Sequence, residues 1–265
     1  LNPIINNHYE LFDSFDSNEK ILIPKINKDL FKINLLKFVE FTKSYLNLMV
    51  GKVNRPLKIL EIGSGSGMFC IALKKLGHKV FSLDKGYLNK EKTNFILKRN
   101  LDLANINIKY VNADITRKTQ FKKDSFDMIV SISVLEHVLD FKNSLKEMYR
   151  LLNKKGCLLH RINPYWCEAG AHALGILDSP WLHAKLDQKE IAHYLKIIRP
   201  YEYDFCMGWI KKNLNKNLSI SYIQRTLSMM GFQISRWTES TNEYRIKKFL
   251  RPQDVTNILR YNKIS

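Results

Sequence analysis

The stretch that decides the fold is KILEIGSGSGMFCIALKKL, residues 58–76. Its first five residues predict a buried strand, and its last nine predict a helix. Between them Gly63, Gly65 and Gly67 alternate with serines, so the backbone can turn sharply and approach a ligand that a Cβ would block. Ligands of open α/β sheets bind beyond the carboxyl ends of the strands. The motif therefore predicts a ligand-binding loop between a strand and a helix.

The same alternation of strand and helix continues along the chain. Further strands are predicted at 78–84, 108–114, 126–134, 157–163 and 232–239, and helices at 33–50, 88–101, 141–156 and 220–232. The first of these helices is expected to bury Ile33, Leu36, Val39, Leu46 and Val50. Strands that alternate with helices favour a mostly parallel, doubly wound sheet covered on both faces.

Four regions follow from this pattern. We expect an N-terminal helical segment at 1–55, a binding core at 56–163, an inserted segment at 164–217 and a completion of the α/β domain at 218–265. The segment 164–217 has three prolines, many aromatic residues and no clean periodicity. An irregular stretch of that length within a domain is usually functional, so we interpret it as a lid over the substrate.

The charge balance is strongly basic, with 43 Lys and Arg against 25 Asp and Glu, a net charge of +18. Such a value is compatible with a nucleic-acid partner. The excess is spread along the chain, and an AT-rich coding sequence also produces many lysines. Two local clusters stand out, Lys211, Lys212 and Lys216, and Arg245, Lys247, Lys248 and Arg251.

The cysteines and the hydropathy pattern indicate a cytoplasmic protein. The four cysteines form no CxxC pair, which favours reduced, mostly buried thiols over a zinc site or a disulfide framework. No apolar run approaches the length of about 20 residues that spans a bilayer. The first residues, LNPIINNHYE, lack the pattern of a signal peptide.

Four motifs in order resemble those of class I S-adenosylmethionine-dependent methyltransferases. Glu61 precedes the three glycines in an E-x-G-x-G-x-G loop, Asp84 ends the second strand, and Asp114 follows the third. The fourth motif is FDMIVSISVLEHV, residues 126–138, which is similar to the ubiquinone and menaquinone methyltransferase-like group known as methyltransferase 11. The resemblance covers about residues 56–163 and implies a Rossmann-like fold with an irregular substrate lid inserted.

The resemblance also implies S-adenosyl-L-methionine as cofactor and S-adenosyl-L-homocysteine as product. Asp84 would accept hydrogen bonds from the ribose hydroxyls, since a carboxylate suits a bidentate diol. Asp114 would accept from the adenine amine, and Ile115 would pack on the ring. The complete set implied for the cofactor is Glu61, Gly63, Ser64, Gly65, Gly67, Asp84, Lys85, Asp114, Ile115, Ser131 and Ser133.

Candidates for catalysis lie in or beside the inserted segment. His172 is the first choice for a general base, His183 is the second, and Tyr165 is a further candidate. The spacing of these histidines from nearby carboxylates matches no standard metal-ligand set, so no metal is expected. Glu136 and His137 are expected to open the next helix, and for His137 a position at the helix start is favoured over a part in the chemistry.

The leading hypothesis is methyl transfer to a small-molecule or glycan acceptor, at oxygen. An RNA methyltransferase that uses the basic surface is the alternative, marked by salt-dependent binding. A non-catalytic scaffold with the same fold is the second alternative, against which the intact glycine and aspartate set speaks. A nicotinamide oxidoreductase is disfavoured because its loop has a different glycine spacing. The oligomeric state is not predicted.

Overall fold

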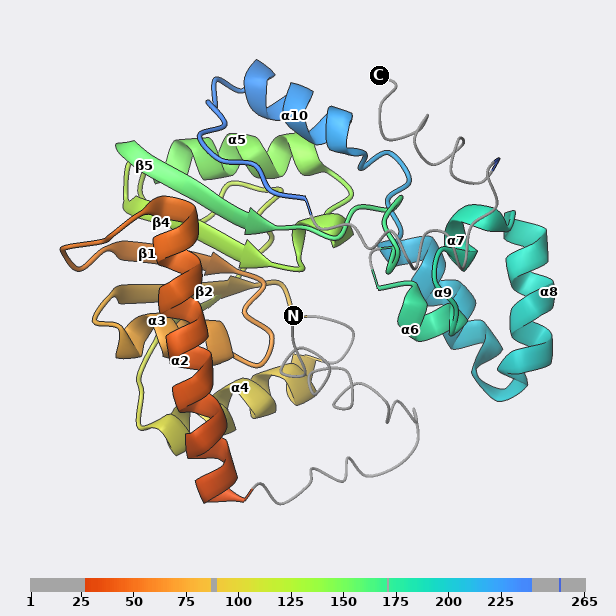
Figure 1. The fold of residues 1–265 in the computed structure, drawn as a ribbon, viewed down its shortest axis with the longest axis horizontal. Coiled ribbons are helices and arrows are strands. Elements are labelled where there is room, and N and C mark those ends of the chain that lie inside the picture. Colours follow the sequence, from red (N-terminus) through yellow and green to blue (C-terminus); the bar gives the residue numbers. More distant parts are fainter. Residues whose placement is uncertain (1–26, 87–89, 171, 240–252, 254–265) are drawn as a thin grey trace.

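A computed structural model of the chain describes residues 27–86, 90–170, 172–239 and 253 (Figure 1). Five parallel strands form one sheet in the order β3-β2-β1-β4-β5. They are β1 (Lys58–Ile62), β2 (Lys79–Asp84), β3 (Lys109–Asn112), β4 (Phe126–Ile132) and β5 (Leu152–Arg161). The strand order reverses beside β1, where a doubly wound sheet opens its binding crevice. The predicted parallel, doubly wound fold is confirmed.

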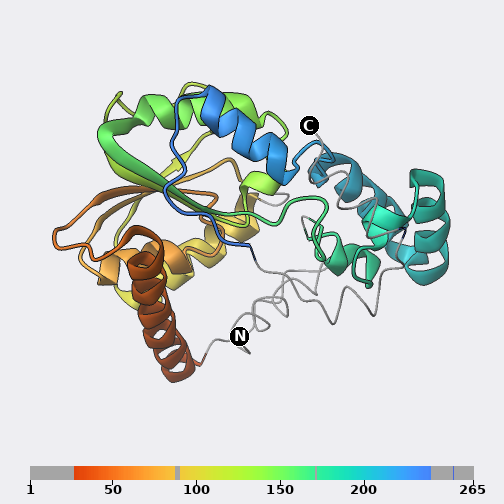
Figure 2. The same cartoon turned by 45° about the horizontal axis from the view of Figure 1, so that its top comes forward.

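Helices cover both faces of this sheet (Figures 1 and 2). One face carries α2 (Lys28–Val50), α3 (Met68–Lys75) and α4 (Lys90–Ala104), and the other carries α5 (Phe141–Leu151) and α10 (Ile220–Met229). Alternate residues of β1 divide between the two cores: Ile59 packs with Phe69 of α3, whereas Leu60 packs with Leu145 of α5. Burial on both faces explains why the central strands β1 and β4 are mostly apolar.

The helix predicted at 33–50 is present as α2, but its buried face differs from the prediction. α2 begins at Lys28, where the side chain of Asn27 accepts hydrogen bonds from the backbone of Asp29 and Leu30. Its buried residues are Phe31, Leu35, Thr42 and Leu46. Of the residues expected inside, only Leu46 is buried, and Ile33, Leu36 and Val50 are exposed. The periodicity was ambiguous because apolar residues occur all round this helix.

The boundary between α5 and β5 was also misplaced. Helix was predicted to continue to Gly156, but α5 ends at Leu151 and β5 begins at Leu152. Gly156 lies within the strand, next to a register irregularity opposite Phe126. A Cβ on Gly156 would lie 3.0 Å from the backbone oxygen of Phe126. This glycine therefore permits close contact between strands and does not stop a helix.

The inserted segment is helical, which corrects the expectation of an irregular lid. It contains α6 (Leu174–Leu177), α7 (Leu182–Lys185), α8 (Gln188–Ile198) and α9 (Tyr203–Asn213). These helices share a small apolar core that includes Leu177, Leu195 and Ile210, and they extend beyond the carboxyl edge of the sheet (Figure 1). A capping box of Asp187 and Glu190 starts α8, a signal that the prediction overlooked.

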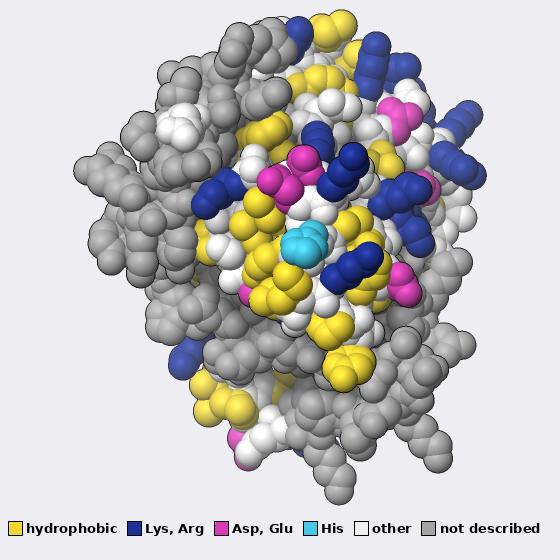
Figure 3. All heavy atoms as spheres, turned by 90° about the vertical axis from the view of Figure 1, so that its right-hand side faces the viewer, with side chains coloured by type: hydrophobic (Ala, Val, Ile, Leu, Met, Phe, Trp, Pro, Cys, Tyr) yellow, Lys and Arg dark blue, Asp and Glu magenta, His cyan; other side chains and the backbone are white. Residues whose placement is uncertain are grey.

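The outer side of α8 faces solvent. A shallow apolar groove there is lined by Leu186, Lys189, Glu190, His193, Tyr194 and Ile197. Figure 3 looks onto this end of the molecule, where hydrophobic side chains lie among lysines. In Figure 1 α8 lies at the end of the helical segment far from the sheet, so this groove is separate from the glycine loop.

The predicted strand at 232–239 is wrong. These residues follow α10 without pairing to the sheet, and no sixth strand occurs within the part of the chain that the structure describes. Phe232 instead packs edge-on against Tyr149 of α5, with ring centroids 5.4 Å apart. The basic cluster Arg245, Lys247, Lys248 and Arg251 lies outside the described residues.

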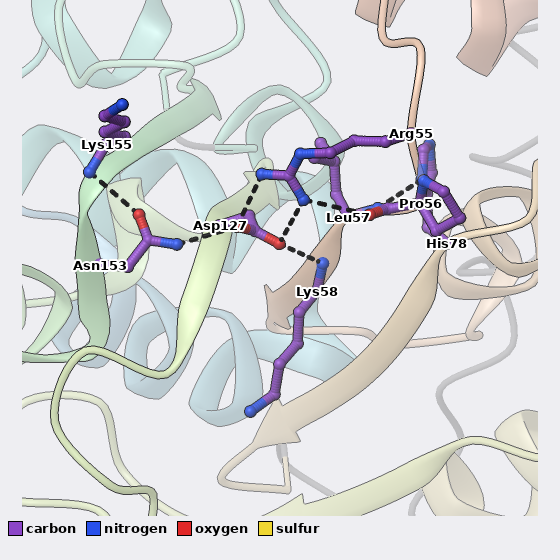
Figure 4. Close-up of polar contacts among 8 residues, drawn as sticks. All are labelled: Arg55, Pro56, Leu57, Lys58, His78, Asp127, Asn153 and Lys155. Carbon is purple, nitrogen blue, oxygen red and sulfur yellow. Dashed lines mark hydrogen bonds and ion pairs between the residues drawn. The ribbon is translucent and has the colours of Figure 1, made fainter.

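A polar network fixes the amino edge of the sheet, opposite the glycine loop (Figure 4). Asp127 of β4 accepts hydrogen bonds from the Arg55 guanidinium at 3.0 and 3.3 Å, from the Lys58 backbone at 2.8 Å and from the Asn153 amide at 2.8 Å. These contacts, that with Arg55 above all, lower the pKa of Asp127 to about 2. The carboxylate thereby ties together the starts of β1, β4 and β5.

Candidate cofactor and active site

The glycine loop occupies the carboxyl end of β1. Gly63, Gly65 and Gly67 all have positive φ, at 70°, 47° and 77°. A Cβ on Gly63 would lie 2.3 Å from a methyl carbon of Val134, and one on Gly67 would lie 2.3 Å from a methyl carbon of Leu97. A Cβ on Gly65 would meet nothing within 4 Å. Gly63 and Gly67 therefore hold the loop close to its neighbours, while Gly65 faces open space where a ligand can approach.

Asp84 lies at the end of β2 and is joined to this loop. Its side chain accepts hydrogen bonds from the backbone N–H of Gly65 at 3.2 Å and of Gly86 at 2.9 Å. The residue is only 4% exposed. Two backbone donors thus hold the Asp84 carboxylate at the side of the loop. Its predicted role, binding the ribose hydroxyls, stays a prediction.

Asp114 follows β3, and it forms an ion pair with Lys85, the residue after Asp84. The ammonium of Lys85 is 3.8 Å from a carboxylate oxygen of Asp114. Burial alone would raise the pKa of Asp114, but hydrogen bonds from Thr116 and the charge of Lys85 lower it. Ile115 is buried in the core that includes Leu60, Ile62 and Leu83. The structure therefore brings both predicted aspartates to neighbouring strand ends.

Two of the predicted cofactor residues, Glu61 and Ser64, are buried around the base of the loop. The Glu61 carboxylate accepts a hydrogen bond from the Cys70 thiol. Burial raises the pKa of Glu61 to about 8, the Cys70 hydrogen bond opposes this, and the charge of Asp84 adds to it. Ser64 accepts a hydrogen bond from the hydroxyl of Ser82. In this arrangement both side chains support the loop from within.

Ser131 and Ser133 lie at the carboxyl end of β4. Ser131 is fully buried, and its hydroxyl lies 2.7 Å from Nδ1 of His160 in β5. Burial lowers the pKa of His160 to about 3. Ser133 has φ 54°, its N–H donates to the backbone oxygen of Arg161 at 2.9 Å, and its hydroxyl accepts from the Asn163 amide at 3.1 Å. These bonds fix the path of the chain just before the next group of polar residues.

A cluster that the sequence analysis missed follows directly. Glu136 and His137 belong to a short 3-10 helix, η1 (Leu135–His137), and His172 of the inserted segment lies against them. His172 Nε2 is 3.5 Å from Glu136 Oε1, and the two imidazole rings stack with centroids 5.2 Å apart. Their signal in the sequence was an acid and a histidine just beyond a strand at the binding edge of the sheet.

These three side chains have the composition of a metal-ligand set. One donor atom from each of Glu136, His137 and His172 lies within 4.8 Å of the others. Burial lowers the pKa of His137, although the charge of Glu136 opposes this, and the lowered pKa favours the neutral imidazole. His183 and the carboxylates considered from sequence spacing are not part of this group.

Tyr165 and His183 are paired with each other at a buried site. The Tyr165 hydroxyl donates to the His183 backbone oxygen, and His183 Nε2 donates to the Tyr165 backbone oxygen, both at 2.5 Å. Burial lowers the pKa of His183 to about 4 and raises that of Tyr165 to about 12. A Cβ on Gly170 would lie 2.0 Å from the His183 ring. This geometry favours a structural role for Tyr165 and His183. Of the three candidates for catalysis, His172 is the one that lies beside Glu136 and His137.

Comparisons with known proteins also indicate similarity to methyltransferases, as the glycine loop and the two aspartates do. A protein-family profile described as "Methyltransferase domain" matches residues 60–160. Two similar curated proteins are both named ubiquinone biosynthesis O-methyltransferase. The one from Bartonella quintana is 28% identical over 61% of this chain and 59% of its own length. The one from Pelagibacter ubique is 30% identical over 39% of this chain and 41% of its own length.

A solved S-adenosylmethionine-dependent methyltransferase from Mesorhizobium loti is 24% identical over 48% of this chain and 56% of its own, with a TM-score of 0.40. The match thus covers less than two thirds of the length of these relatives. Among the described residues, no helix has the length and apolar character needed to cross a membrane. Residues 60–160 resemble a methyltransferase domain, and the chain is similar over part of its length to S-adenosylmethionine-dependent methyltransferases.

Proposed function

We propose that the protein transfers the methyl group of S-adenosylmethionine to a hydroxyl oxygen of a small-molecule or glycan acceptor. The observation that carries the cofactor part is the position of Asp84. Its carboxylate is held by the N–H groups of Gly65 and Gly86 beside the open side of the loop. A fixed carboxylate accepts hydrogen bonds from two vicinal hydroxyls and repels a phosphate. The site therefore suits the ribose of an adenosyl cofactor.

The reaction requires little of the protein beyond alignment. The acceptor oxygen attacks the methyl carbon, the carbon–sulfur bond breaks with its electrons passing to sulfur, and the products are S-adenosylhomocysteine and a methyl ether. The hydroxyl proton must leave, which is where a positioned base or electrophile contributes. Glu136, His137 and His172 lie at the same edge of the sheet as the loop, since Val134 packs against Gly63.

The oxygen acceptor is supported by two further points. The named relatives are O-methyltransferases, although at low identity. A polar cluster able to remove a proton is needed for an alcohol or phenol but not for a carboxylate. We propose that the helical segment 164–217 closes over the acceptor, because it supplies His172 to this cluster.

The test is calorimetric titration with S-adenosylhomocysteine. The folded protein is expected to bind it with micromolar affinity. Asp84→Ala removes hydrogen bonds to a charged acceptor, each worth about 1.5–3 kcal/mol, so binding should weaken at least about tenfold. Asp102→Ala is the matched control, because Asp102 is an exposed carboxylate on α4. Absence of binding by the folded wild type, or equal binding by the Asp84 variant, would refute the proposal.

Acceptors are then screened by transfer of a labelled methyl group. Hydroxylated small molecules and glycans are expected to accept it. RNA is the comparison, and methylation of RNA with binding that falls steeply as salt rises would indicate the alternative function.

A further inference from the structure

We propose that the amino edge of the sheet binds the sugar-phosphate backbone of a nucleic acid, at a surface separate from the site of methyl transfer. Basic residues that are spread along the sequence gather here in space, because every strand of a parallel sheet begins at the same edge. We call this surface the basic edge, and its residues are Lys52, Arg55, Lys58, Lys75, Lys79, Lys109, Lys122, Lys123, Lys154 and Lys155. The inference goes beyond the proposed function and does not depend on it.

The residues of the basic edge stand at the starts of strands or in the connections that lead into them. Lys58, Lys79 and Lys109 are the first residues of β1, β2 and β3. Lys154 and Lys155 lie in the irregular start of β5. Neighbouring strands lie about 4.8 Å apart, so a surface across five strand starts extends over about 20 Å.

Few of these charges are neutralised within the described part of the chain. The Arg55 guanidinium is 3.0 Å from Asp127, and the Lys123 ammonium is 3.9 Å from Asp124. The other residues of the basic edge form no ion pair with a described residue. Figure 4 shows that Asp127 already accepts hydrogen bonds from Arg55, the Lys58 backbone and Asn153. Excess positive charge gathered on one surface attracts a polyanion.

Lys58 and Lys79 show this excess most directly. They are register partners on the neighbouring strands β1 and β2. Their ammonium groups lie 5.4 and 6.0 Å from the centre of the same Phe81 ring, and that of Lys58 lies 5.1 Å from the Phe126 ring. The aromatic faces hold both cations in place, although two like charges repel each other. A phosphate bound between them would remove that repulsion.

Helix ends do not account for this arrangement. Cations stabilise the carboxyl end of a helix, and this explains Lys75 in the last turn of α3. Lys58, Lys79 and Lys109 belong to strands, and sheets have only small net dipoles. The lysines at the strand starts therefore need another explanation, which an anionic partner supplies.

The form of the surface favours a nucleic acid over a lipid bilayer. A peripheral membrane helix combines cations with an apolar face that enters the lipid. Most residues of the basic edge instead lie on strand starts and connections. Phosphates of one nucleic-acid strand follow each other at about 3.4 Å along the helix axis, so about six of them match the 20 Å extent of the edge. Lysine binds such phosphates as a point charge.

The basic edge and the glycine loop lie at opposite ends of β1. A strand of this length, Lys58–Ile62, spans about 17 Å. A nucleic acid on the basic edge therefore leaves the loop and Asp84 open. Salt-dependent binding without methylation of the bound nucleic acid is expected, which differs from the behaviour of an RNA methyltransferase.

The experiment measures binding of a labelled oligouridylate RNA to the full chain by fluorescence anisotropy, at salt concentrations between about 50 and 200 mM. The triple variant Lys79→Gln, Lys109→Gln, Lys155→Gln removes exposed cations from three strands. Its affinity at low salt should fall by more than about tenfold, and the slope of log K against log salt should become shallower by about 2, since each phosphate contact on a single strand contributes about 0.7. An oligothymidylate DNA is titrated in parallel, and the tighter binder identifies which nucleic acid supplies the backbone.

The matched control is a triple variant with the same net charge. Lys189→Gln, Lys211→Gln, Lys212→Gln removes exposed cations from α8 and α9, and it should bind like wild type. Circular dichroism checks that both variants are folded, and the single variant Lys109→Gln should already reduce the slope by about 0.7. Absence of RNA and DNA binding by the wild type at low salt, or equal weakening in both triple variants, would overturn the proposal.

Two further measurements exclude other occupants and other sites. Vesicles of phosphatidylglycerol should bind more weakly than the nucleic acid, and the reverse order would assign the basic edge to a lipid surface. Calorimetric titration with S-adenosylhomocysteine should give the same affinity with and without the RNA. Competition between the two would place the RNA at the cofactor loop and contradict the proposal, whereas failure of S-adenosylhomocysteine to bind at all would refute the proposed function alone.

Discussion

Gly63→Ala should destabilise the protein because of one defined contact. Gly63 has φ 70°, and a Cβ there would lie 2.3 and 2.6 Å from the two methyl carbons of Val134. The left-handed backbone costs an alanine about 1–2 kcal/mol. Overpacking against Val134 adds about 1–3 kcal/mol. The free energy of unfolding should therefore fall by about 2–5 kcal/mol, measured by urea denaturation followed by circular dichroism.

Two further variants separate these contributions. Gly77 has φ 89° and nothing within 4 Å of a Cβ, so Gly77→Ala should cost only the backbone part, about 1–2 kcal/mol. Val134→Ala should partly rescue Gly63→Ala, because it removes both clashing methyl groups but leaves its Cβ at 3.0 Å. If Gly63→Ala costs no more than Gly77→Ala, or if the double variant shows purely additive losses, the account of this contact is wrong.

Three other predictions concern the loop, the buried acid beneath it and the helical segment. Gly65→Ala should cost about as much stability as Gly77→Ala, since neither added Cβ meets an atom, but only the Gly65 variant should lose affinity for S-adenosylhomocysteine by calorimetry. The pKa of Glu61 is raised to about 8, so the folded state holds a proton that the unfolded state releases. As the pH rises from about 5 to 8, the free energy of unfolding should fall by up to about 1.4 kcal/mol per pH unit. Glu61→Gln should make this dependence weaker in urea denaturation measured at a series of pH values. Gly170→Ala would place a Cβ 2.0 Å from the His183 ring, so hydrogen exchange should speed up in 164–217 and not in the sheet; uniform exchange would argue against this.

The positions of the glycine loop and of the two aspartates could be predicted from the sequence because their geometry is local. The turn between β1 and α3 requires glycines at fixed positions, and the apolar pattern located the strands that Asp84 ends and that Asp114 follows. In a parallel sheet, the carboxyl ends of the strands meet at one edge. Two aspartates far apart in sequence therefore become neighbours without any knowledge of side-chain packing.

The cluster of Glu136, His137 and His172 could not be predicted in the same way, because its contacts are between distant residues. His172 meets Glu136 only after the segment 164–217 has folded into helices around its own apolar core. The prolines and aromatic residues of that segment masked its helices. His183 looked like a base by residue type, but the fold buries it against the Tyr165 backbone. Residue type alone does not distinguish a histidine that holds the fold from one that faces a ligand.

Backbone strain distinguishes the two sides of the site as well. Six described residues other than glycine have positive φ: Asn105, Asp124, Ser133, His172, Asp178 and Trp181. Asparagine and aspartate tolerate this conformation through short polar side chains. Ser133, His172 and Trp181 adopt it without that advantage, and they lie just after β4 or within the inserted segment. Such strain persists only where the surroundings impose it. Described backbone hydrogen bonds hold all three residues: the Ser133 N–H donates to the Arg161 oxygen, the Gly175 N–H donates to the His172 oxygen, and the Trp181 N–H donates to the Glu168 oxygen. These bonds and the apolar core of the helical segment hold it together as one unit, so we expect it to move as a whole, with His172, when it closes over the acceptor.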